Sequence, residues 1–220
     1  MNPVVSRQAL RWAALAAALA ASAGCAHAGA GYDQPNEPME TSTMLQAPSA
    51  TIEGEGVRLE ATLQAPAGGP VQVRYRVHNT GGEDLAVFDR GNRHAVLTGR
   101  QQTGEVGEPV FREEDGAGLV LSHIAMPLPD PPPTLPPVPL AARLAPGGVL
   151  EGEFSFSPLT ATPPQRVRWC LGVGAFSEES FHAPEQAGGL EVWRAPLDAA
   201  ANQQLLCTPW LDVARGAFEE

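Results

Sequence analysis

Apolar and polar residues alternate strictly in several separate segments of this chain, and this period of two is the feature that most constrains its fold. In residues 71–78, valine or tyrosine stands at every odd position and Gln, Arg or His at every even position. Residues 57–63 and 166–173 repeat the pattern of apolar odd positions. Successive side chains of a β-strand point to opposite faces, so each segment predicts a strand with one buried and one solvated face.

Turn signals separate these segments. The 220 residues include 23 glycines and 22 prolines, a proportion that favours many turns and disfavours a helical bundle. Further strands are expected at residues 85–88, 94–97, 110–112, 119–124, 149–156, 189–193 and 205–213, with one short helical turn within residues 195–204. The pattern predicts an all-β fold, an antiparallel β-sandwich of about 8–10 short strands.

The N-terminus reads as an export signal over residues 1–24. Arg7 and Arg11 precede an uninterrupted apolar run of ten residues, Trp12 to Ala21, whereas a membrane-spanning helix needs about 20. A cleaved signal peptide therefore fits better than a permanent span.

The run Ser22-Ala23-Gly24-Cys25 resembles the lipobox of bacterial lipoproteins. That resemblance implies that Cys25 becomes the acylated first residue of the mature protein, so that a lipid such as palmitate anchors it to the cell-envelope membrane. In a Gram-negative cell, Ala26 after the cysteine implies the outer membrane, facing the periplasm. The family usually has leucine where this chain has Ser22. The alternative is cleavage after Ala28, in the A-x-A sequence of residues 26–28, which gives a secreted or periplasmic protein.

The remainder divides into a tether and a domain. Residues 25–55 are expected to form a disordered tether, because their central part is polar and carries few large apolar side chains,. Residues 56–220 are expected to form the β domain. Without the first 24 residues, 12 arginines and 25 acidic residues remain, giving a net charge of −13. Such a charge repels phosphate backbones, so no nucleic-acid partner is expected.

Two stretches of the β domain carry a resemblance to a known fold. One is the strand of residues 71–78 with its Asn79-Thr80-Gly81 turn and the following strand, and the other is the Pro146-Gly147 turn that leads to Phe154. Both resemble Ig-like domains of bacterial surface proteins, and they are weakly similar to BsuPI-type proteinase-inhibitor domains. The resemblance covers about half of the mature chain. It implies an Ig-like sandwich and, as an alternative function, protease inhibition.

Cys170 and Cys207 remain once Cys25 is assigned to the lipid. Two cysteines of one exported domain usually pair, so we expect a disulfide between them. In its strand Cys170 falls on the face opposite Trp169, which places the bridge on the outside of the sheet.

The other residues that could bind a metal or a ligand are better explained by structural roles. His123 and Met126 are three residues apart and could hold copper, but a strand end is the plainer interpretation, and no metal is expected. Glu113-Glu114-Asp115 is expected at a hairpin tip rather than in a calcium loop. Three tryptophans could line a ligand groove, although core packing is the default: Trp169, Trp193 and Trp210.

Residues 127–139 form a Pro-rich loop. Their proline density excludes a helix or a central strand and favours a stiff, extended segment. A preformed extended segment can dock into an aromatic groove of a partner. The candidate binding residues are Pro131, Pro132, Pro133, Leu135 and Pro136.

Together these features predict an exported, lipid-anchored envelope protein whose β-sandwich binds a protein or an envelope component. No catalytic residues and no cofactor are expected, since the chain lacks a G-x-S-x-G motif and paired histidines at metal-site spacing,. The alternatives are a BsuPI-type protease inhibitor and, less favoured, a periplasmic metal carrier or hydrolase.

Overall fold

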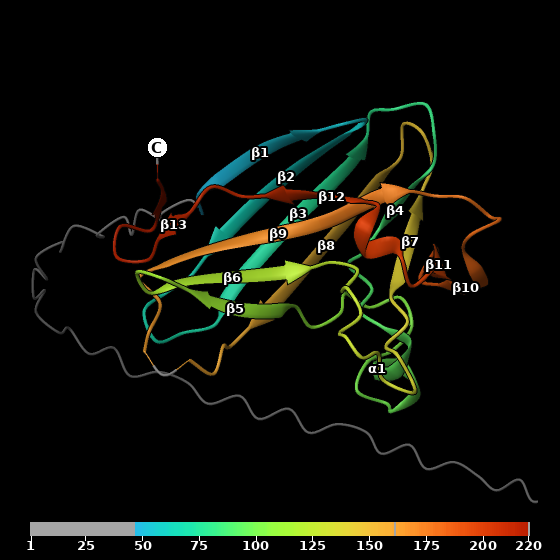
Figure 1. Cartoon of the computed structure of the whole chain (residues 1–220). Coiled ribbons are helices and arrows are strands. Elements are labelled where there is room, and N and C mark those ends of the chain that lie inside the picture. The colour runs from blue at the N-terminus through green and yellow to red at the C-terminus, as the bar shows by residue number, and fades with distance from the viewer. Residues whose placement is uncertain (1–46, 161, 220) are drawn as a thin grey trace, which may run out of the picture. The chain divides into compact units, whose positions relative to one another are not determined.

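Two β-sheets packed face to face form the domain in the computed structural model, which describes residues 47–160 and 162–219 (Figure 1). The all-β sandwich is thus confirmed. The first sheet has four antiparallel strands in the order β1-β2-β3-β8. Their bounds are Ser49–Gly54 for β1, Val57–Gln64 for β2, Val71–Asn79 for β3 and Val149–Phe156 for β8.

The second sheet is built around β9 (Arg166–Ala175). One edge of β9 pairs with β4 (Leu85–Val87) and β6 (Gly118–His123), and the other edge pairs with β12 (Gln203–Cys207) and β13 (Leu211–Asp212). The remaining strands extend this sheet outward from these. Beyond β4 lie β7 (Leu140–Leu144), β11 (Leu190–Arg194) and β10 (His182–Ala187), while β5 (Val110–Glu114) pairs with β6 and β14 (Ala217–Phe218) pairs with β13.

The core lies between the two sheets and follows the alternation of the sequence. The odd-numbered apolar side chains of residues 57–63 and 71–77 are at most 3% exposed, and those of residues 167–173 are fully buried. Burial of each large apolar side chain contributes about 1.5–3 kcal/mol, so the alternating segments supply most of the packing that joins the sheets.

The fold has more strands than expected, fourteen in the described residues against about 8–10. β1 occupies the end of the expected tether, so the ordered domain begins at least seven positions before residue 56. β7 was not anticipated because it is buried on both faces and shows no alternation,. β10 was missed because it is almost wholly exposed and contains Pro184,.

Two expected strands differ in detail. Residues 94–97 do not form a strand but part of the short helix α1 (Arg93–Leu97), whose first turn is capped by Asn92, its side chain accepting from the Ala95 N–H at 3.0 Å,. The expected last strand, residues 205–213, is split into β12 and β13 around Pro209, because proline cannot donate a ladder hydrogen bond. The helical turn within residues 195–204 is confirmed at Ala199–Ala201.

The sheets are also not purely antiparallel, since β6 runs parallel to β9. This pairing brings His123 and Leu121 of β6 beside the central strand. Within the described part of the chain, no helix has the length and apolar character needed to cross a membrane.

Candidate functional site

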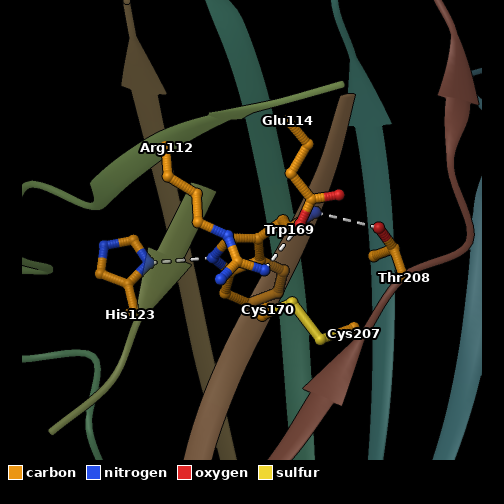
Figure 2. Close-up of a disulfide and its surroundings, with 7 residues drawn as sticks. All are labelled: Arg112, Glu114, His123, Trp169, Cys170, Cys207 and Thr208. Carbon is orange, nitrogen blue, oxygen red and sulfur yellow. Dashed lines mark hydrogen bonds and ion pairs between the residues drawn. A yellow bond between two sulfur atoms is a disulfide. The ribbon is translucent and has the colours of Figure 1, made fainter. Parts of the chain in front are cut away.

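A disulfide joins Cys170 in β9 to Cys207 in β12, as the cysteine count predicts. The two residues are direct partners in the antiparallel ladder, with their Cα atoms 4.0 Å apart. Because Trp169 and Leu171 on either side face the core, the bridge lies on the outer face of the second sheet (Figure 2). Its chemistry is that of a cross-link between neighbouring strands.

Thr208 and Trp169, which lie next to the disulfide, join the same two strands by hydrogen bonds to the backbone. Thr208 donates its N–H to the Trp169 carbonyl at 2.8 Å, and its hydroxyl oxygen accepts the Trp169 N–H at 3.1 Å (Figure 2). Thr208 is 2% exposed. The hydroxyl therefore continues the ladder at the point where Pro209 ends the regular strand.

His123 is buried and engaged at both ring nitrogens. The Trp169 indole N–H, which can only donate, lies 3.0 Å from Nδ1 of His123 (Figure 2),. The proton must therefore reside on Nε2, which donates to the Gly107 carbonyl at 2.7 Å. Burial lowers the pKa of His123 below its ordinary value,. Met126, the expected copper partner of this histidine, is exposed on the loop beyond it.

A buried ion pair lies near this histidine and was missed by sequence reasoning. Asp89 and Arg90, only 0% and 3% exposed, contact each other at 2.9 Å. Asp89 also accepts the Tyr75 hydroxyl at 2.6 Å, and Arg90 donates to the Gly104 carbonyl at 2.8 Å. Burial and the Asp89 carboxylate raise the pKa of Tyr75 well above its ordinary value, so the phenol stays protonated as a donor.

The ion pair had one detectable signal in the sequence. Tyr75 stands on the apolar face of its predicted strand, and a buried phenol usually requires an acceptor. The sequence gives no comparable signal at Asp89 and Arg90, because charged residues next to glycine and asparagine normally lie at the surface. That Asp89 is the acceptor is seen only in the structure, where the segment after β4 packs against β3.

The Pro-rich loop is exposed and held at both ends. Its five candidate residues are solvent-exposed or half-buried, and Leu135 is 88% exposed. At the start, the Gln203 side chain accepts the Ala125 N–H at 3.0 Å and donates to the Ala125 carbonyl at 2.7 Å. At the end, Pro139 accepts from the Ala195 N–H, and the Arg93 N–H donates to Val138.

The three tryptophans do not line a common groove. Trp169 lies in the main core, and Trp193 packs in a second apolar cluster with Phe176 and Phe181. Trp210 is half-buried, with the Arg166 and Arg168 guanidinium groups 4.5 and 4.9 Å from its ring. The core interpretation holds for two of them.

The acidic hairpin tip is where the sequence predicts it. Glu113 and Glu114 end β5, and Asp115 starts the turn into β6. Glu114 pairs with Arg112 on its own strand at 2.6 Å (Figure 2). In residues 47–160 and 162–219, no three His, Cys, Asp or Glu side chains form a group that could hold a metal ion.

Cys25, the expected lipidation site, lies outside the described residues, as do the signal peptide, the rival cleavage site at Ala28 and most of the tether. Comparison with known proteins adds nothing to these observations: no family model, curated protein or solved structure matches this chain.

Proposed function

We propose that this chain is an exported, lipid-anchored domain that binds a protein or an envelope component through its Pro-rich loop. The observation that carries this proposal is the loop itself: its backbone is fixed at both ends, while Leu135 at its middle is 88% exposed. A segment whose ends are already fixed before binding loses less conformational entropy when a partner contacts it.

The disulfide supports export. Disulfides persist in oxidising compartments such as the periplasm and are rare in the cytosol. Attachment through Cys25 is the more specific part of the proposal, and it is tested by mass spectrometry of the N-terminus of protein purified from cells. A diacyl or triacyl mass on Cys25 supports the anchor. A free N-terminus at Gly29 rejects it in favour of secretion.

A binding role rather than a catalytic one is supported by the way the buried polar groups are used. Both ring nitrogens of His123 are occupied, Asp89 is paired with Arg90, and the two described cysteines are bonded to each other. Each group is thus already engaged by another part of the domain, and general acid–base catalysis would require a group free to exchange a proton with a substrate.

The loop is tested by site-specific photo-crosslinking in intact cells. We expect a photoreactive residue at position 135 to give a discrete cross-linked species. The matched control is position 159, a leucine that is 93% exposed on a different loop. Equal labelling from both positions, or none from position 135, contradicts a binding role for the loop.

The alternatives have separate tests. If the loop blocks a protease, the purified protein inhibits at least one member of a protease panel, and Leu135→Asp abolishes that inhibition. If the protein carries a metal, elemental analysis of protein purified from cells finds a stoichiometric metal ion.

A further inference from the structure

The two flanks of the sandwich differ. On the flank formed by β1 and β12 (Figure 1), Gln204 bridges the sheets: it accepts the Glu55 N–H and donates to the Glu55 carbonyl, each at 2.9 Å. On the opposite flank β8 is the edge of the first sheet and β5 is an edge of the second. Each of these two strands is hydrogen-bonded along one side only in the part of the chain that the structure describes.

A groove of about 720 Å³ follows this open flank. One wall is the second half of β8, and the other is the segment of residues 91–110 that leads into β5. Phe154 and Phe156 of β8 and Val110 supply apolar surface, and the Phe111 ring, 42% exposed, lies 5.6 Å from the ring of Phe156. Phe156 is only 8% exposed and Phe154 is half-buried, so the exposed apolar surface beside the unpaired edge comes mainly from Val110 and Phe111. Exposed apolar surface beside an unpaired strand edge invites the addition of another strand.

The groove is acidic. Glu105, Glu108 and Glu153 line it, against a single arginine, Arg100. Glu153 is paired with Arg74 at 3.0 Å, whereas Glu108 makes no ion pair with the described residues. The surrounding charge therefore favours a partner segment that carries lysine or arginine.

A second copy of this chain is a poor occupant, because the chain carries a net charge of −11 and would bring further negative charge to an acidic groove. In the registers centred on charged residues, self-pairing also opposes like charges. If β5 pairs with itself about a two-fold axis at Arg112, that arginine faces its own copy, and an axis at Glu113 opposes two glutamates. In β8, an axis at residue 151, 152 or 153 brings glutamate opposite glutamate. Like charges directly opposite each other destabilise a strand pair.

We propose that this flank binds an extended, basic segment of another protein, which adds as a strand to the free edge of β8. Alternate apolar side chains of that segment lie in the groove beside Phe154 and Val110, and its basic side chains face Glu153 and Glu108. Backbone hydrogen bonds to β8 supply affinity, and the alternation supplies specificity. This surface is separate from the residues proposed for the Pro-rich loop, so either proposal can fail without the other.

The test uses the full-length protein purified from cells and a short capped peptide of alternating lysine and valine. We expect saturable binding in calorimetric titration, and slower amide hydrogen exchange in residues 153–156 when the peptide is bound. Glu153→Lys is expected to weaken binding at least tenfold. A peptide of the same composition with all lysines before all valines is expected to bind at least tenfold more weakly.

The matched control is Glu151→Lys. Glu151 lies on the same strand and the same face, it pairs with Arg76 at 2.8 Å as Glu153 pairs with Arg74, and it does not line the groove. Little change in affinity with this variant supports the groove. Equal weakening by both variants, or binding without protection of the β8 amides, reduces the effect to attraction by an acidic surface and overturns the proposal.

Discussion

Asp89 and Arg90 form an ion pair that is buried inside the domain, and Asp89 also accepts a hydrogen bond from the Tyr75 hydroxyl. Such pairs are costly to desolvate and add little net stability, but removing one partner leaves an uncompensated buried charge. The pair links β3 to the loop that contains Gly104, because Asp89 accepts from Tyr75 of β3 and the adjacent Arg90 donates to the Gly104 carbonyl. Its role is therefore to position the segment of residues 89–107.

Asp89→Asn is expected to lower the free energy of unfolding by about 3–5 kcal/mol, measured by urea denaturation at neutral pH. The control is Glu153→Gln, which removes a carboxylate paired with Arg74 at an exposed site and is expected to leave stability within error of wild type. Equal losses in the two variants would show that the buried pair does not hold the fold.

Because His123 is buried, we expect the free energy of unfolding to fall at acidic pH. Since its pKa is lowered in the folded protein, the unfolded chain binds a proton first as the pH falls below about 6.5, and the free energy of unfolding decreases toward the folded-state pKa. His123→Gln is expected to reduce the slope of stability against pH between pH 7.5 and 5. His94→Gln, at an exposed histidine of α1, is the control, and an unchanged slope in His123→Gln contradicts the assignment.

At the scale of elements, two neighbouring glutamines of β12 hold different parts of the molecule. Gln203 fixes the start of the Pro-rich loop at Ala125, and Gln204 closes the flank beside β1 at Glu55. Gly172 in β9 accommodates the first of these side chains, since a Cβ at that position would overlap the Gln203 amide. The anchor of the loop therefore depends on a glycine of the central strand.

Gln203→Ala is expected to accelerate hydrogen exchange of the Ala125 amide by about 10- to 100-fold, since each lost hydrogen bond to a buried group is worth about 1–3 kcal/mol. Gln204→Ala serves as the matched control. It removes an equivalent pair of bonds from the same strand, and it is expected to affect Glu55 and not Ala125. If both variants affect Ala125 alike, β12 as a whole holds the loop.

Most of the strands that are well predicted from the sequence have one buried face and one solvent-exposed face. β2 and β3 alternate cleanly because one side meets the core and the other meets water or a less buried layer,. β9 is buried on both faces over residues 169–174, and its sequence still alternates because its second face carries arginine, cysteine and glycine. β7 is buried on both faces and β10 is exposed on both, so neither carries an alternation. α1 is one short turn held by the Asn92 cap, too short for a helical period to be detected,.

At the scale of the whole molecule, the disulfide closes a loop with a sequence separation of 37 residues. In the chain-entropy model such a closure is worth about 4 kcal/mol. The loop includes β10, β11 and the last part of the second sheet up to β12. The bridge therefore ties the C-terminal strands to the centre of the fold.

Addition of a thiol reductant is expected to lower the free energy of unfolding of the wild-type protein by about 4 kcal/mol, measured by urea denaturation. A variant with both Cys170→Ala and Cys207→Ala is expected to show the lower stability and no response to reductant. A reductant effect that persists in the double variant must have another cause, and it would contradict this assignment.

The sequence by itself determines the fold class, the faces of the main strands, the pairing of Cys170 with Cys207 and the position of the Pro-rich loop. These follow from local periodicity, from proline chemistry and from the count of cysteines. The tertiary structure alone decides that β6 lies parallel to β9, that Asp89 and Arg90 are buried, and that one flank is closed while the other is open. These features depend on contacts between residues far apart in the chain, which no local pattern records.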